Sequence, residues 1–148
     1  MIDEIGLKIL KILQEKARIP NVEVARQVGM APSAVLERIR KLESQGYING
    51  YEVILDPEKF NRNLIAFIHV YVDNSNDVGD DISELEDVQE VHYLTGMDCY
   101  FVKARVSDTN ELDTLLRKKI ATIKGVKSTK TSIAISTFKE TSRIPIEL

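Results

Sequence analysis

Proline and glycine residues divide positions 1–46 into three short segments, and this punctuation constrains the fold more than any other feature of the sequence. Within each segment apolar residues recur at helical spacing, so each segment predicts a short amphipathic helix. Pro20 ends the first helix, because its ring and its missing N–H are poorly tolerated inside a helix. Gly29 suits a left-handed turn after the second helix, Pro32 suits the first turn of the third, and Gly46 suits its C-terminal cap. Two short helices joined through a glycine turn are typical of a helix-turn-helix.

The spacing of the apolar residues also predicts which face of each helix is buried. Asn21 is the expected N-cap of the second helix. The residues expected to point inward are Ile5, Ile9, Ile12 and Leu13 in the first helix, Val22, Ala25 and Val28 in the second, and Val35, Ile39 and Leu42 in the third. The opposite face of the third helix is therefore free for a ligand or for solvent.

That free face carries groups that suit DNA. Its residues are Ser33, Ala34, Glu37, Arg38 and Lys41. Arginine and lysine hydrogen-bond guanine or phosphate, a carboxylate can accept from cytosine N4, and a hydroxyl at a helix N-terminus favours phosphate or a base edge. The five residues are the predicted DNA-binding residues of a recognition helix that enters the major groove. The pattern alone is equally consistent with a three-helix packing unit that has a solvated, charged face.

Charge is unevenly distributed along a chain whose net charge is −3. Residues 1–50 hold eight Lys and Arg against six Asp and Glu, a balance of +2, and residues 51–148 hold twelve against seventeen, a balance of −5. A basic end on an acidic remainder is expected when only one end of a protein contacts phosphate. The small excess leaves a second hypothesis open, in which the chain is an assembly or ligand-sensing module without DNA binding.

The pattern changes in the second half to alternating strands and helices. Strands are predicted at 64–72, 91–95, 100–106 and 126–138, and helices at 76–86 and 110–123. This order predicts a ferredoxin-like βαββαβ domain. The fold class is therefore α+β. The predicted parts are a winged helix-turn-helix at 1–50, a hinge strand at 51–62 and an α/β domain at 63–148.

Taken together, these motifs resemble the leucine-responsive/asparagine-synthesis regulator family (Lrp/AsnC, the feast/famine regulators). The matching segments are 5–10, 25, 29–35, 38–42 and 46–48 in the first half, and 94–96, 100–106, 125–126 and 129–131 in the second. The resemblance covers nearly the whole chain. It implies a prokaryotic transcription regulator that binds double-stranded DNA, dimerises through the α/β domain, often assembles further to octamers, and responds to an amino acid.

The resemblance also implies where an effector binds. The implied residues lie in the turn after Thr95 and in the final strand, and they are Gly96, Met97, Asp98, Cys99, Ser132 and Ala134. Backbone N–H groups around the glycine can hold the carboxylate of an amino acid. Asp98 is the only acidic side chain in the turn that can hold its ammonium, and burying an ammonium without a partner is costly.

Three positions depart from the family's pattern. The first helix has Gly6 where the family usually has Asp, and we expect this glycine to loosen the helix. Ala31-Pro32 stands where Ser-Pro is usual, which removes one N-cap hydroxyl. Cys99 stands where many members carry an Asp, with Asp98 one place earlier, and this change bears on which effector the protein takes.

The predicted sheet also points to self-association. Two helices cover only one face of a four-stranded sheet, so the other face must be buried against a partner, and a dimer follows. The apolar pattern does not define that face cleanly. The strand residues that show this mixture are Ile65, Phe67, His69, Phe101 and Lys103.

Catalytic and metal-binding chemistry has little support in the sequence. His92, Asp98 and Cys99 can meet around one turn as a nucleophilic or metal site, but a buried thiol and strand-face imidazoles are the simpler interpretation. No glycine-rich phosphate loop occurs, and no cofactor is expected. The single cysteine and the lack of a basic, apolar leader predict a reducing, cytoplasmic location.

One enzyme class has to be compared, because sirohaem decarboxylases resemble the same family in fold. Those enzymes tend to carry an arginine and Gly-Ala after the Gly-x-Ile hinge, whereas residues 46–51 here read Gly-Tyr-Ile-Asn-Gly-Tyr. We therefore expect a regulator and not an enzyme.

Overall fold

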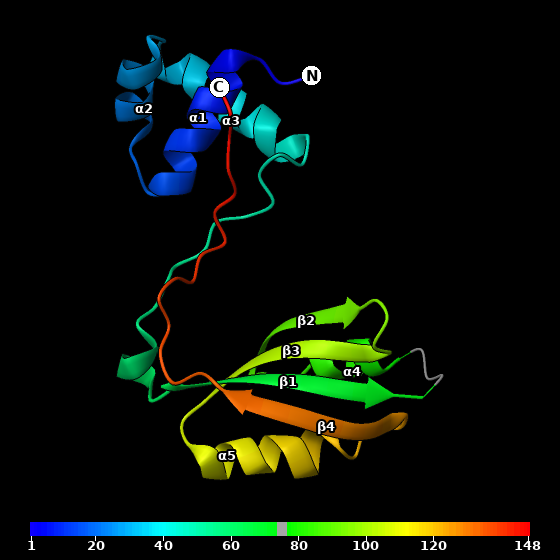
Figure 1. Ribbon diagram of the computed structural model, residues 1–148. Coiled ribbons are helices and arrows are strands. Elements are labelled where there is room, and N and C mark those ends of the chain that lie inside the picture. Colours follow the sequence, from blue (N-terminus) through cyan, green and yellow to red (C-terminus); the bar gives the residue numbers. More distant parts are fainter. Residues whose placement is uncertain (74–76) are drawn as a thin grey trace. The chain divides into compact units, whose positions relative to one another are not determined.

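The computed structural model describes residues 1–73 and 77–148, and the chain forms two compact units (Figure 1). Unit 1 consists of Met1–Ile54 together with Lys139–Leu148, and unit 2 consists of Leu55–Phe138. The chain therefore passes from one unit to the other twice. Within the described residues, no helix has the length and apolar character needed to cross a membrane.

Unit 1 contains three helices, α1 (Glu4–Glu15), α2 (Asn21–Val28) and α3 (Pro32–Ser44). Gly29 ends α2 in the left-handed conformation with φ 71°, and a proline occupies the first turn of α3, as the sequence predicts. The buried core residues of the unit are Ile9, Leu13, Val24, Ala25, Val35, Ile39 and Leu42. This arrangement confirms the predicted helix-turn-helix.

The start of α2 differs from expectation. The helix begins at Asn21 itself, with Pro20 at the N-cap position and no side-chain cap hydrogen bond. Val22, expected inside, is 67% exposed, and Val24 is completely buried in its place. The two valines lie about 200° apart around the helix, so only one of them can face the core.

The described residues of unit 2 form a four-stranded antiparallel sheet with helices on one face. The strands are β1 (Leu64–Val72), β2 (Val88–Leu94), β3 (Cys99–Val106) and β4 (Val126–Ile133), in the spatial order β2-β3-β1-β4. The helices are α4 (Val78–Ser83) and α5 (Thr109–Thr114), which continues into a π-helical segment, η2 (Leu115–Ile120). Apolar residues of these helices pack against even-numbered residues of β1 and β3. The predicted βαββαβ order is confirmed, although the expected start of the acidic helix at Asn76 lies outside the described residues.

The connection between α3 and β1 corrects the predicted hinge strand at 51–62. Residues 51–56 form no regular element, and η1 (Pro57–Phe60) is a short 3-10 helix. The Asp56 carboxylate accepts a hydrogen bond from the Glu58 amide at 3.1 Å and so caps this helix. An aspartate followed by proline thus starts a helical turn here, because it supplies both the cap and the preset backbone angle.

The final strand is shorter than the predicted 126–138. The Ala134 amide donates to the Ile65 carbonyl at 2.9 Å, close to the beginning of β1. Beyond this point β1 offers no further partner, and Phe138 is 99% exposed. The strand ends because its neighbour ends.

The last ten residues correct the predicted extent of the α/β domain, 63–148. Residues 139–148 belong to unit 1. There the Gln14 side-chain amide hydrogen-bonds both backbone groups of Ile144, donating to its carbonyl at 2.7 Å and accepting from its amide at 2.8 Å. Arg143 adds a hydrogen bond to the Glu15 carbonyl at 3.2 Å. These contacts attach the C-terminal segment to the end of α1.

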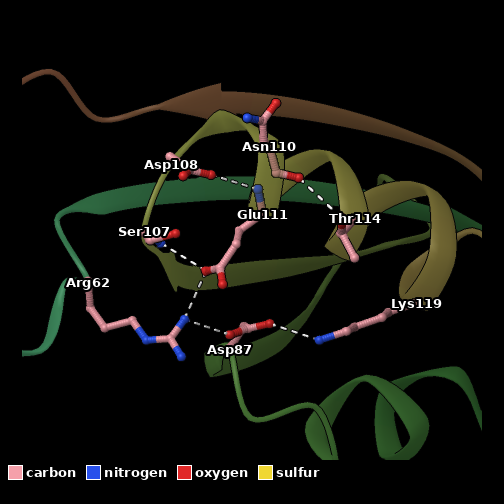
Figure 2. Close-up of polar contacts among 8 residues, drawn as sticks. All are labelled: Arg62, Asp87, Ser107, Asp108, Asn110, Glu111, Thr114 and Lys119. Carbon is pink, nitrogen blue, oxygen red and sulfur yellow. Dashed lines mark hydrogen bonds and ion pairs between the residues drawn. The ribbon is translucent and has the colours of Figure 1, made fainter.

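A charged network fixes the chain where it enters β1 (Figure 2). Arg62 Nη1 lies 3.2 Å from Asp87 Oδ1 and 3.0 Å from Glu111 Oε2. Lys119 Nζ lies 3.1 Å from the other oxygen of Asp87. The Asp108 carboxylate caps α5 by accepting from the Glu111 amide at 2.8 Å. The network connects Arg62, two residues before β1, to the start of α5 and to Asp87, the residue before β2, which also contacts η2 through Lys119.

Candidate nucleic-acid interface and effector turn

The outer face of α3 is the candidate nucleic-acid interface. The buried stripe of this helix consists of Val35, Ile39 and Leu42. Ser33 and Glu37 are exposed on the opposite side, and Ala34 is half-buried beside them. Lys41 is exposed as well, and in the described part of the chain its ammonium has no ion-pair partner. Four of the five predicted DNA-binding residues therefore lie on an accessible surface.

Arg38, the fifth, lies at the margin of that surface. Its side chain is 35% exposed, and its Nη1 donates to both carboxylate oxygens of Asp3, at 2.9 and 2.8 Å. The same carboxylate caps α1 by accepting from the Gly6 amide at 2.8 Å. These hydrogen bonds, first the amide and then the guanidinium, lower the pKa of Asp3 below its ordinary value. The free protein thus holds Arg38 in an ion pair between the N-terminal segment and α3.

Arg40 is an accessible basic residue that is not among the five predicted DNA-binding residues. It is exposed, and among the described residues its guanidinium has no hydrogen-bond or ion-pair partner. Its position was available from the sequence, because Arg40 follows Glu37 by three residues and Ser33 by seven. Those spacings place side chains on one face of a helix.

The predicted turn around Gly96 lies between β2 and β3, and two of its residues have a left-handed backbone. Gly96 has φ 78°, and Asp98 also adopts a left-handed conformation, with φ 48°. The Tyr93 hydroxyl donates to the Asp98 carboxylate at 3.3 Å. Partial burial raises the pKa of this tyrosine, and the nearby Asp98 charge acts in the same direction. Met97 is exposed at the tip of the turn. Gly96, Met97 and Asp98 are therefore accessible to a ligand.

Cys99 is completely buried at the start of β3. Burial is the main reason that the pKa of its thiol is raised, and the adjacent Asp98 carboxylate acts in the same direction. A neutral, inaccessible thiol is a poor nucleophile. His92 hydrogen-bonds the Glu90 carboxylate at 3.1 Å. In the ranges 1–73 and 77–148, no group of three or more His, Cys, Asp and Glu is placed to hold a metal ion.

The other implied effector residues lie elsewhere on the sheet. Cys99 on β3 pairs with Tyr71, whereas Ser132 on β4 pairs with Phe67. Tyr71 and Phe67 are four residues apart on β1, which is about 13 Å along the strand, and β3 and β4 lie about 10 Å apart on the two sides of β1. Cys99 and Ser132 are therefore roughly 16 Å apart. Ala134 is farther still, because it meets Ile65. One chain does not bring the turn and the final strand together into one binding site.

The face of the sheet that the helices leave uncovered carries an aromatic cluster. Phe67 and Phe101 stack with ring centroids 5.7 Å apart, and His69 meets Phe101 edge-on at 4.9 Å. Lys103 pairs with Phe67 in the sheet register, and its ammonium lies 3.4 Å from the Glu90 carboxylate. The expected dimer depends on this uncovered face, which carries both aromatic rings and charged side chains.

Two family models match the chain. A winged helix-turn-helix DNA-binding model matches residues 2–49, and an Lrp/AsnC ligand binding domain model matches residues 65–144. The chain is 34% identical over 151 residues to the leucine-responsive regulatory protein of Salmonella typhimurium, with 99% of this chain and 92% of that protein covered. The leucine-responsive regulatory protein of Escherichia coli (strain K12) matches with the same identity and coverage.

Solved structures match both halves as well. A transcriptional regulator from Neisseria meningitidis, in a complex with L-Met, has a TM-score of 0.91 and 30% identity, covering 98% of this chain and 97% of that one. Escherichia coli AsnC has a TM-score of 0.87 and 27% identity, covering 98% of this chain and 99% of that one. The chain belongs to the Lrp/AsnC family of transcriptional regulators.

Proposed function

We propose that this chain is a prokaryotic, cytoplasmic transcription regulator that binds double-stranded DNA by placing α3 in the major groove. The observation that carries the proposal is the outer face of α3, where polar and basic side chains lie opposite a buried apolar stripe. A recognition helix needs such a free face, held by the helix that precedes it. Family membership supports the same function, because the matched relatives are named regulatory proteins.

The proposed contacts come from four residues of this face. Ser33 lies at the N-terminus of α3, where its hydroxyl and the free backbone N–H groups suit a phosphate. Ala34 can contact a thymine methyl group, and Glu37 can accept from cytosine N4. Lys41 has a free ammonium for phosphate or guanine. Arg38 stays at the margin while Asp3 holds it.

The active form is proposed to be a dimer, and the resemblance to the family extends this to an octamer. The half-buried aromatic cluster of Phe67, His69 and Phe101 supports a partner on the uncovered sheet face, since apolar patches that reach the surface mark association sites. A two-fold dimer presents two recognition helices. Its operator should therefore be a near-palindrome with half-sites roughly 10 base pairs apart, or a multiple of that spacing.

The proposed effector is an amino acid bound at the turn of Gly96 and Asp98. The turn offers an accessible carboxylate for an ammonium and a backbone that a ligand can approach closely. A matched relative was solved in complex with L-Met, which supports this class of ligand. Because Ser132 is roughly 16 Å from Cys99, a site that uses both regions must take one of them from another copy.

The test of DNA binding is selection of duplexes from a random pool, followed by affinity measurements over a range of salt concentrations. We expect a near-palindromic sequence, with log affinity falling linearly with log salt as counterions are released. A protein that selects no duplex and shows no salt-dependent binding would contradict the proposal and favour the ligand-sensing module. Calorimetric titration with the common amino acids tests the effector separately.

A further inference from the structure

We infer that Arg40 is a base-contacting residue of α3, and that Arg38 is a positioning residue which Asp3 holds at the margin of the DNA-facing surface. The inference rests on the proposed function, since it assigns roles within the same interface. It changes which arginine reads DNA.

Arg40 lies on the same stripe of α3 as Ser33 and Glu37. Steps of four and three residues rotate by about 400° and 300°, so these three side chains lie within roughly 60° of one another. That stripe is opposite the buried side of the helix. Long side chains on a helix lean toward its N-terminus, which is the end of a recognition helix that contacts base edges. Arg40 can therefore reach bases from the middle of the exposed face.

Arg38 lies between the exposed face and the buried stripe. It is about 60° from Val35 and about 40° from Leu42 around the helix. Its half-buried side chain turns toward the N-terminal segment, where both oxygens of Asp3 accept from Nη1. To read a base, Arg38 would have to leave this ion pair, whereas Arg40 has no partner to leave in the described residues.

Asp3 is itself held by local structure. Its carboxylate caps α1 through the Gly6 amide at 2.8 Å. A Cβ on Gly6 would lie only 2.7 Å from Ile2 Cγ1 and 3.2 Å from Asp3 Oδ1. Ile2 in turn packs against the core of unit 1. The glycine that departs from the family pattern therefore lets Ile2 and Asp3 lie close to the first turn of α1.

The two arginines can also make different kinds of contact in the DNA complex. An Arg–carboxylate contact that persists in the complex fixes the position of α3 against α1 and carries no sequence information. A free guanidinium on the exposed face can make the two parallel hydrogen bonds that distinguish guanine from other bases. In unit 1, Arg38 therefore fixes the position of α3 and Arg40 reads the DNA sequence.

The experiment uses the full chain and the duplex that it selects. Arg40→Ala should weaken binding roughly 5- to 100-fold and relax the preference at one base position. Lys11→Ala is the matched control, because it removes one exposed positive charge from α1 in the same unit. The control should retain the base preference. An Arg40→Ala protein that selects the same sequence with unchanged affinity would overturn the role of Arg40.

A double-mutant cycle decides the role of Arg38. Asp3→Asn keeps a side-chain oxygen for the N-cap but removes the charge, and Arg38→Met removes the partner. If Arg38 acts through Asp3, both variants weaken DNA binding by similar amounts, less than Arg40→Ala does. The double variant is then no worse than either single one, and base preference is unchanged.

The opposite result is equally clear. The positioning role of Arg38 would be overturned if Arg38→Met relaxed the preference at one base position while Asp3→Asn retained or strengthened DNA binding. That result would show that Arg38 reads DNA. Unchanged DNA affinity in both variants would overturn that role as well. A wild-type protein that selects no duplex would overturn the proposed function and, with it, both arginine assignments.

Discussion

The two candidate sites differ in how much of each one chain contains. The DNA-facing surface is a run of residues on a single helix, positioned by one buried stripe. The implied effector residues are divided between the turn at Gly96 and a strand position roughly 16 Å away. A surface on one helix can work in each chain by itself, whereas a divided site needs a second copy to complete it.

This difference explains how assembly and regulation are connected in the proposed function. DNA contacts depend on unit 1 and on the spacing of two helices in a dimer. In the proposed function, amino-acid binding depends on contacts between copies in unit 2. An effector that stabilises one arrangement of copies can then change DNA binding without touching α3, provided that it binds the arrangements with different affinity.

Substitution of one buried isoleucine by alanine in each core has the largest expected effect. Ile39 is buried in the core of unit 1 and Ile68 in that of unit 2, so Ile39→Ala and Ile68→Ala should each cost about 2–5 kcal/mol in the unit concerned. Ile39→Ala should weaken DNA binding with self-association retained, and Ile68→Ala should weaken self-association. Denaturant unfolding and sedimentation measure both effects. A single transition that both variants shift equally would show that the two units do not unfold independently.

Asp98→Asn tests the effector turn. Loss of the carboxylate should weaken binding of an amino acid by about 1.5–3 kcal/mol, the usual contribution of a hydrogen bond to a charged group. Asparagine tolerates the left-handed backbone of Asp98, so the variant should fold. Calorimetric titration against wild type is the measurement. Equal binding by both proteins would show that Asp98 does not hold the ammonium.

Lys41→Ala should have a smaller and more general effect. A free ammonium that contacts phosphate contributes to every duplex alike, so affinity should fall by about the same factor for all sequences, and the salt slope should decrease by about 1. Amino-acid binding should not change. Affinity measurements on selected and unrelated duplexes are the test, and an effect on the selected duplex alone would assign Lys41 to guanine in place of phosphate.

The sequence predicted α3 well and its long-range contacts poorly. Val35, Ile39 and Leu42 define the buried stripe by spacing alone, and the structure agrees. The ion pair that holds Arg38 involves Asp3, which is 35 residues earlier, and no local pattern indicates such a contact. Arg40 follows Glu37 by three residues, so the same helical spacing places it on the exposed face.

In unit 2 the predictable part was again local. Glycine and aspartate at the β2–β3 turn adopt the positive φ values that such turns require. The distance from Cys99 to Ser132 depends on how β1 pairs with strands on both sides, and this register is not visible in any single segment. The prediction of a hinge strand was wrong for a local reason, because Asp56 caps a helical turn.

Acid should produce the smallest effect, and it should act on unit 1. The pKa of Asp3 is below its usual value of 3.8, because the Gly6 amide and then Arg38 stabilise the carboxylate. The resulting stabilisation is present above that usual value and is lost as the pH falls through the lower pKa of the folded state. Asp3→Asn should remove this part of the acid dependence. An identical pH profile of unfolding for variant and wild type would contradict the contribution.

The comparison between a site within one chain and a site between copies is tested most directly with a dissociated protein. Phe101 stacks on Phe67 in the uncovered sheet face, and Phe101→Asp should prevent that face from pairing. Sedimentation is used first to verify that the variant is a monomer. Calorimetry with the best-bound amino acid is then the decisive measurement. We predict that the monomer loses amino-acid binding while its unit 1 still binds a single half-site weakly. A monomer that binds the amino acid as tightly as wild type would show that the effector site lies within one chain.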